Sequence, residues 1–160
     1  MTDLEALWDF DDPAGSEQRF RDAAAATSGP ERVVLMTQVV RALGLQARYG
    51  EGHALLDELN GWDRRAPDET VCAVLARFDL ERGRLFRSAG DLREASACFE
   101  DAETHAREAR DAALEIDALH MQALLAAPAE AIELNTLALE RARGSEERTA
   151  RSWEASLLNN

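Results

Sequence analysis

Small and large apolar residues recur at fixed spacings near the middle of the chain, and this pattern predicts two packed helices. Gly83 stands three residues before the aromatic Phe86, which lets the first helix approach its neighbour closely. In the second helix the small Ala95 is followed four residues later by the bulky Phe99. Gly90 lies between the two stretches, and we expect it to end the first helix. The pattern therefore predicts a helix–turn–helix unit.

The pattern of the second helix is repeated along the chain. Its small position recurs at spacings of 36, 43 and 36 residues, at Ser16, Gly52, Ala95 and Ala131. In three of the four copies a bulky apolar residue follows four positions later. In the last copy this position holds Asn135, which is either a buried polar residue or a sign that this copy is misaligned. We favour misalignment. The recurrence predicts an array of similar helix pairs.

Together with Leu80, Leu92 and Ala102, the central pattern resembles the tetratricopeptide repeat. The long spacings are similar to those of the long-repeat branch of that family, which includes kinesin-light-chain-like and peptide-sensing bacterial proteins. The resemblance covers most of the chain. It implies an all-α fold, a right-handed superhelical solenoid of antiparallel helix pairs.

Capping residues, prolines and glycines predict where the helices begin and end. Helices are expected to start near residues 12 and 30, where a capping residue precedes a proline. Asp91, with Glu94 three residues later, predicts a capping box. The longest loop is expected at residues 60–67. We predict one domain, made of a partial unit or N-terminal cap, three full units and the first helix of a further, truncated unit: 1–27, 30–60, 68–108, 111–143 and 145–160.

Apolar residues at the C-terminal end predict an open face. Trp153, Leu157 and Leu158 are expected on one side of the last helix, with no following helix to cover them. Either the chain breaks off inside a further repeat, which we favour, or another copy of the chain covers this face. The second possibility predicts self-association.

Composition supports the helical prediction and excludes several functions. Apolar residues make up 46% of the 160 residues and aromatic residues only 6%, so the apolar content is mostly Ala and Leu, which favour helices. With 31 acidic and 18 basic residues, the net charge of -13 argues against nucleic-acid and anionic-membrane partners. Every basic residue is Arg. We attribute this to a codon bias like that of a GC-rich bacterium, and it excludes lysine chemistry.

The sequence predicts no catalytic, metal or cofactor site. Cys72 and Cys98 have no CxxC spacing, and the three histidines are scattered, so neither a disulfide nor a zinc site is expected. Nucleophile elbows, phosphate-binding loops and paired metal-ligand histidines are not found in the sequence. The first ten residues lack the basic start and apolar run of a signal peptide, so we expect a cytoplasmic protein.

Candidate ligand-binding residues lie on the first helix of each unit, which in such repeats lines a concave groove. They are Arg41, Arg77, Arg84, Arg87, His120, Asn159 and Asn160. In the fourth unit the inward positions are expected at Ile116, His120 and Leu124. Guanidinium groups bind carboxylates in a fixed, two-pronged geometry, so an arginine stripe predicts acidic groups on the partner. The alternative is that these arginines pair locally, with Glu81, Asp79 or Glu115.

The predicted function is a non-enzymatic scaffold for protein–protein interaction, which binds a peptide or a partner helix in the concave groove. The alternative is a peptide-sensing regulatory domain, whose solenoid changes curvature on binding and controls a transcription factor or a phosphatase. Both predictions name a protein or peptide partner, and neither needs a cofactor.

Overall fold

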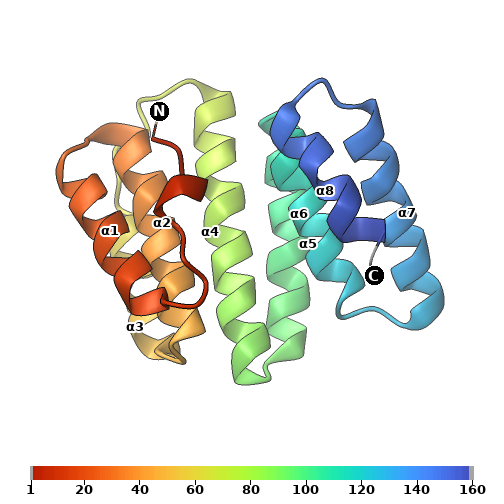
Figure 1. Ribbon diagram of the computed structural model, residues 1–160, viewed down its shortest axis with the longest axis horizontal. Helices are drawn as coiled ribbons and strands as arrows, with labels where there is room; N and C mark the ends of the chain where they lie inside the picture. The colour runs from red at the N-terminus through yellow and green to blue at the C-terminus, as the bar shows by residue number, and fades with distance from the viewer. Residues whose placement is uncertain (1, 159–160) are drawn as a thin grey trace.

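The computed structural model describes residues 2–158, and within them the protein is all-helical, as the sequence predicts (Figure 1). A short 3-10 helix precedes eight α-helices, and these residues form no strand. The elements are η1 (Glu5–Leu7), α1 (Pro13–Ala25), α2 (Gly29–Leu45), α3 (Tyr49–Leu59), α4 (Asp68–Ala89), α5 (Leu92–Glu108), α6 (Ala112–Ala123), α7 (Pro128–Gly144) and α8 (Arg148–Leu158).

The helices begin close to the predicted positions. At α1 the side chain of Asp12 accepts a hydrogen bond from the backbone N–H of Gly15 at 3.0 Å, and Pro13 is the first helical residue. At α2 the N-cap is Ser28 rather than the predicted Gly29. The longest loop between the described α-helices lies between α3 and α4, at residues 60–67, as the sequence predicts.

Gly90 ends α4, as predicted, because its backbone adopts a left-handed conformation that favours glycine. Its φ is +92°, and the next N–H, that of Asp91, donates to the carbonyl oxygen of Phe86 at 2.9 Å. The capping box predicted at the start of α5 is absent. Asp91 is the N-cap residue, but its side chain accepts no capping hydrogen bond. The turn is therefore fixed by the glycine and not by the carboxylate.

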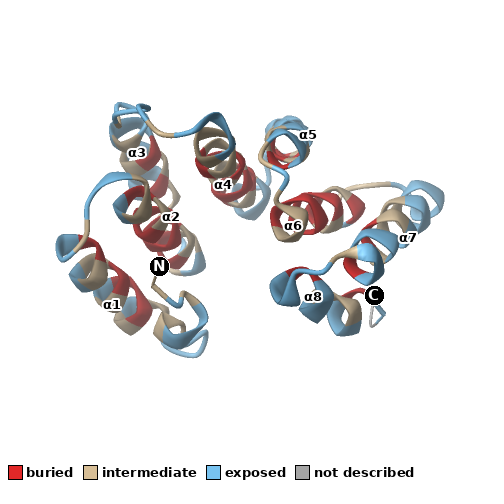
Figure 2. Cartoon of the chain, turned by 90° about the horizontal axis from the view of Figure 1, so that it is seen from above, coloured by how far each residue is buried: buried red, intermediate tan, exposed pale blue. Residues whose placement is uncertain are grey.

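Consecutive α-helices pack on one another along the whole chain, from α1 on α2 to α7 on α8. Helices two apart also meet, because α2 packs on α4, α4 on α6 and α6 on α8. Seen from above, the helices form an arch, with α2, α4, α6 and α8 along its inner side and α3, α5 and α7 along its outer side (Figure 2). The inner helices therefore face a common concavity.

Close helix contacts depend on glycines at two positions. A Cβ atom on Gly83 would lie 2.5 Å from Cε1 of Phe99, so α4 and α5 could not pack this closely with a larger residue there. A Cβ atom on Gly52 of α3 would lie 2.8 Å from Cδ1 of Leu85 on α4. Phe99 is fully buried in the core between α4, α5 and α6, as the sequence pattern predicts.

The buried residues of α7 show that the repeat copy containing Asn135 is correctly aligned with α5. In α5 the small residues Ala102 and Ala106 are fully buried, three and seven positions after Phe99. In α7, Ala138 and Ala142 are also fully buried, three and seven positions after Asn135. Asn135 therefore occupies the position that Phe99 occupies in α5. Its Oδ1 atom is buried and has no hydrogen-bond partner among the described residues.

The last helix is covered on the side that the sequence leaves open. Trp153 and Leu157 pack into a core with residues of α6 and α7, including the fully buried Ile116. Leu158 does not share this side and is 61% exposed. The expectation that all three apolar residues lie on one uncovered face is therefore wrong, because α8 folds back onto α6 as well as α7.

Candidate functional site

Three cavities lie in a row along the inner side of α4 and form one groove, which we call the inner groove. The central cavity has a volume of about 510 Å³. A second cavity of about 570 Å³ adjoins it at Leu4 and Arg77, and a third of about 240 Å³ adjoins it at Arg41 and Glu81. The groove therefore follows α4 from its first turn to its last.

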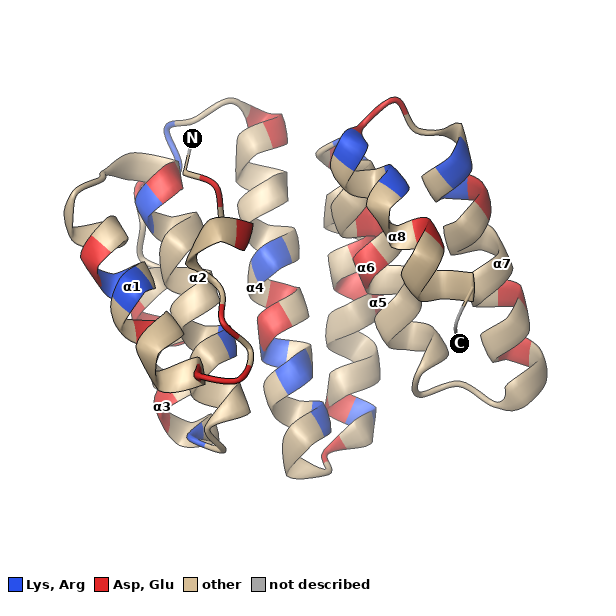
Figure 3. Cartoon of the chain, in the orientation of Figure 1, with Lys and Arg blue, Asp and Glu red and all other residues tan. Residues whose placement is uncertain are grey.

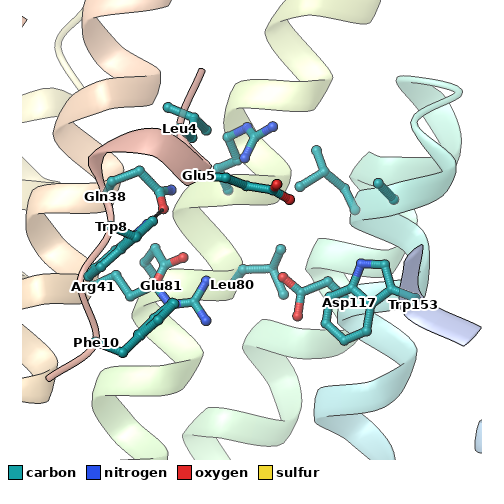
Figure 4. Close-up of a pocket in the computed structure, with 13 residues that line it drawn as sticks. Leu4, Glu5, Trp8, Phe10, Gln38, Arg41, Leu80, Glu81, Asp117 and Trp153 are labelled. Carbon is teal, nitrogen blue, oxygen red and sulfur yellow. Dashed lines mark hydrogen bonds between the residues drawn. The ribbon is translucent and has the colours of Figure 1, made fainter. Parts of the chain in front are cut away.

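The central cavity has a floor of helical residues and two walls from opposite ends of the chain (Figure 4). One wall is the N-terminal segment, with Trp8 and Phe10, and the other is Trp153 of α8. The complete lining is Leu4, Glu5, Trp8, Phe10, Gln38, Arg41, Arg77, Leu80, Glu81, Ala113, Leu114, Asp117 and Trp153. The cavity thus combines aromatic walls with charged groups of both signs.

The N-terminal segment is held in place by contacts with α1 and α2. The indole N–H of Trp8 donates to Oε1 of Gln38 at 3.1 Å, and the Trp8 ring packs against Phe20. Arg19 of α1 donates to the carbonyl oxygen of Leu7 at 2.9 Å. The segment is therefore a fixed wall of the cavity.

Arg84 is bound by two carboxylates. Its Nη2 atom donates to both carboxylate oxygens of Asp117, at 2.6 and 2.7 Å, and its Nη1 atom donates to Oε1 of Glu81 at 2.6 Å. Burial alone would lower the pKa of Arg84, but the charges of Asp117 and Glu81 outweigh it and raise the pKa. For Arg84, the alternative of local pairing, which the sequence leaves open, is the correct one.

Arg41 lies against two aromatic rings instead of a carboxylate. Its guanidinium carbon is 5.7 Å from the centre of the Trp8 ring and 5.6 Å from that of Phe10. The two rings are stacked, with centres 4.8 Å apart. Burial lowers the pKa of Arg41, and the nearby charge of Arg84 acts in the same direction. Cation–π contact therefore replaces an ion pair here.

The other two predicted arginines lie at the ends of the central cavity or beyond it. Arg77 lines the junction between the central and second cavities. Arg87 is exposed and lines the third cavity, near the end of α4. All four arginines therefore line the inner groove. They do not form an uninterrupted basic stripe, because carboxylates of α4 and α6 lie between them (Figure 3).

On α6 the groove-facing side differs from the predicted one. Ala113, Leu114 and Asp117 line the central cavity, whereas Ile116, predicted to point inward, is fully buried in the core with α7 and α8. His120 of α6 contacts α8, with its ring centre 5.6 Å from that of Trp153, and burial lowers its pKa. The remaining candidates, Asn159 and Asn160, lie outside the described residues.

Sequence reasoning missed the two walls and Asp117, whereas it offered Glu81 as a local partner of the arginines. Trp8 and Phe10 belong to the short segment before α1. Two aromatic residues close together in this segment were the signal that could have indicated the wall. Glu81 follows Leu80 by one residue, and Asp117 is three residues before His120. Each carboxylate lies close to a predicted inward position on its own helix. The sequence does not indicate that both carboxylates bind Arg84.

The described part of the chain offers binding groups but no metal centre. Within residues 2–158 no group of three His, Cys, Asp or Glu side chains is arranged to hold a metal ion. None of the helices in that range combines the length and the apolar composition that crossing a membrane requires. No protein-family model, no curated protein and no solved structure matches this chain.

Proposed function

We propose that this protein is a non-enzymatic interaction scaffold that binds a peptide or a partner helix in the inner groove. The observation that carries the proposal is the row of three connected cavities along α4. The lining stretch of α4 runs from Glu69 to Ser88, which corresponds to about 28 Å of helix. An extended peptide of about eight residues has the same length.

The proposal includes the architecture of the tetratricopeptide repeat, with α2–α3, α4–α5 and α6–α7 as helix pairs of a right-handed solenoid. Two features support it. Gly83 packs against Phe99 within the central pair, at the small and large positions of such a repeat. The buried alanines of α5 and α7 share one register, which is expected of repeated units.

The chemistry of the groove suits recognition by both apolar and polar contacts. Leu80, Leu114 and Trp153 supply apolar surface in the central cavity, and Arg41 and Glu81 supply a hydrogen-bond donor and an acceptor. A peptide needs both kinds of contact, because its backbone polar groups must be paired when they leave water. A groove already formed in the free protein lowers the entropic cost of binding.

The two thiols support a function without covalent catalysis. Burial raises the pKa of Cys98 to about 11, and burial together with Glu108 raises that of Cys72. Both thiols are therefore protonated at neutral pH, whereas a nucleophilic cysteine needs a lowered pKa. Cys98 also lies on α5, on the outer side of the arch.

Site-specific photocrosslinking in the source cells tests the proposed groove. The photoreactive residue p-benzoylphenylalanine replaces Arg87, which is exposed in the third cavity, or Arg93, which is exposed on α5. The two positions are matched in residue type and exposure. We expect a protein crosslink from position 87 and none from position 93. Equal crosslinks, or a crosslink from position 93 alone, would show that the partner does not bind in the groove.

A further inference from the structure

We propose that the central cavity binds a cationic side chain of the partner, an arginine or a lysine, with Glu81 as its main acceptor. This inference rests on the proposed function of the inner groove and specifies the chemistry of the partner. It differs from the sequence-based expectation, which predicts acidic groups on the partner because of the arginines.

Glu81 has an acceptor atom without a donor. The residue is only 3% exposed, and its Oε1 atom accepts a hydrogen bond from Arg84. Its Oε2 atom is buried and has no hydrogen-bond partner among the described residues. Glu81 lines both the central and the third cavity, so its carboxylate lies where the two cavities meet. An unpaired carboxylate oxygen in a buried site favours a charged donor over a neutral one.

The ion pairs of the cavity also leave room for a cation. Glu81 and Asp117 form ion pairs with one guanidinium, that of Arg84, whereas the charge of Arg41 acts on both carboxylates without forming an ion pair with either. A third carboxylate, that of Glu5, points into the central cavity from the N-terminal segment (Figure 4). The protein as a whole has a net charge of -13, which accelerates encounters with cationic partners.

The cations already present do not complete the cluster. Arg41 forms no ion pair with Glu81 or Asp117 and lies against the stacked rings of Trp8 and Phe10. Arg77 lines the far end, where the second cavity begins. Between these arginines the cavity presents the Glu81 carboxylate and, on the opposite wall, the Trp153 ring, which offers a cation–π surface.

Tryptophan indole signals provide a direct readout of binding in this cavity. The chain has three tryptophans, of which Trp8 and Trp153 line the central cavity. Trp62 follows α3, borders a separate cavity and serves as an internal reference. The whole chain, labelled with ¹⁵N, is titrated with N-acetyl-arginine amide, N-acetyl-glutamine amide or N-acetyl-glutamate amide. We expect the arginine probe to shift the Trp8 and Trp153 signals saturably and to leave Trp62 unchanged.

Two other outcomes of the titration would overturn the proposal. Shifts of Trp8 and Trp153 with the glutamate probe, but not with the arginine probe, would assign an acidic partner group to Arg41 and Arg77. Equal shifts with the glutamine and arginine probes would show that charge is not recognised. In either case the photocrosslink from position 87 still tests the groove separately, so the two proposals can fail independently.

Charge-neutralising variants locate the acceptor. We expect Glu81→Gln to weaken binding of the arginine probe by about tenfold. Glu115→Gln is the control, because Glu115 is also buried but pairs with Arg107 and Arg141. Unchanged affinity in a folded Glu81→Gln would refute the proposal. If Glu81→Gln unfolds, the wild-type protein decides: an affinity for the arginine probe no higher than for the glutamine probe would refute it.

Discussion

The guanidinium of Arg84 on α4 donates to both carboxylate oxygens of Asp117 on α6, at 2.6 and 2.7 Å. A single nitrogen, Nη2, makes both hydrogen bonds, and they join two helices of the inner side that are separated in sequence by α5. Both side chains are largely buried, with exposures of 16% and 13%. The pair therefore links α4 to α6 and, at the same time, forms part of the floor of the inner groove.

We expect Asp117→Asn to lower the free energy of unfolding by about 2 kcal/mol, because the variant removes a charge-assisted pair from a largely buried position. The matched control is Asp57→Asn. Asp57 pairs with Arg82, but its side chain is 71% exposed, so the expected loss is below about 0.5 kcal/mol. Urea unfolding followed by circular dichroism measures both. Equal losses would contradict the structural role assigned to the Arg84–Asp117 pair.

The contact between Gly83 and Phe99 predicts that a methyl group at position 83 destabilises the protein. In Gly83→Ala the new Cβ would lie 2.5 Å from Cε1 of a fully buried ring. Overpacking costs about 1–3 kcal/mol, and the better helix propensity of alanine offsets about 1 kcal/mol of it. We therefore expect a net loss of up to about 2 kcal/mol, measured by thermal or urea unfolding.

A second glycine provides the control for this substitution. A Cβ on Gly50, in the first turn of α3, would meet nothing within 4 Å. We expect Gly50→Ala to leave stability unchanged or to raise it by about 0.5 kcal/mol, because alanine restricts the unfolded chain. If both variants lost the same stability, backbone effects and not the Phe99 contact would explain the loss at Gly83.

The N-caps of the successive helices α5 and α6 predict unequal effects of the same substitution. Asp111 accepts a hydrogen bond from the N–H of Leu114 at 3.0 Å, whereas the Asp91 side chain accepts none at the start of α5. We expect Asp111→Ala to cost about 1 kcal/mol and Asp91→Ala less than half of that. Urea midpoints of the two variants, compared at equal slope, give the difference. A larger loss of stability in Asp91→Ala would show that the Asp91 side chain caps α5, as the predicted capping box requires.

Residue spacing was sufficient to predict the helices and much of their packing. The small and large positions around Gly83 and Phe99 depend only on local sequence and on contacts between adjacent helices. Gly90 is a further case, because a left-handed residue at a helix end strongly favours glycine. Such features are visible in a single sequence, since each is fixed by residues close together along the chain.

The cavity could be predicted only in part, because it combines residues that are distant in sequence. Its walls, Trp8 and Trp153, come from opposite ends of the described chain, and no local pattern relates them. The arginines of α2 and α4 line the inner groove. Their pairing with nearby carboxylates was one of two alternatives, but Asp117 was not predicted as a partner, because it reaches Arg84 from 33 residues away. Spacing shows which way a helix face points but not which charges meet across two faces.

Asn135 illustrates the opposite error, in which a correct alignment was doubted because one residue did not fit. The buried alanines Ala138 and Ala142 keep the same register as Ala102 and Ala106 of α5. A sequence position normally filled by a bulky apolar residue is therefore occupied by an amide. The register of an element is set by all of its buried residues together, so one polar exception does not shift it.

The pH dependence of stability is expected to reflect Glu17, a buried carboxylate of α1. It accepts hydrogen bonds from Gln46 at 2.9 Å and from Arg21 at 2.8 Å, and it pairs with Arg48 at 2.7 Å. Burial alone would raise the pKa of Glu17, but these hydrogen bonds and charges together lower it below its ordinary value of 4.5. Because the folded-state pKa is lowered, the contribution to stability is complete above pH 4.5 and is lost as the pH falls through the folded-state pKa.

Glu17→Gln tests this linkage. We expect the variant to lose about 1–2 kcal/mol of unfolding free energy at pH 7, since the arginine partners are partly exposed and screened by solvent. The difference from the wild-type protein should shrink below pH 4.5, because protonation of Glu17 then removes the same charge from the wild type. Urea unfolding of both proteins between pH 7 and pH 3.5 measures the difference. A loss that stays constant over this range would mean that Glu17 stabilises α1 by packing and not by its charge.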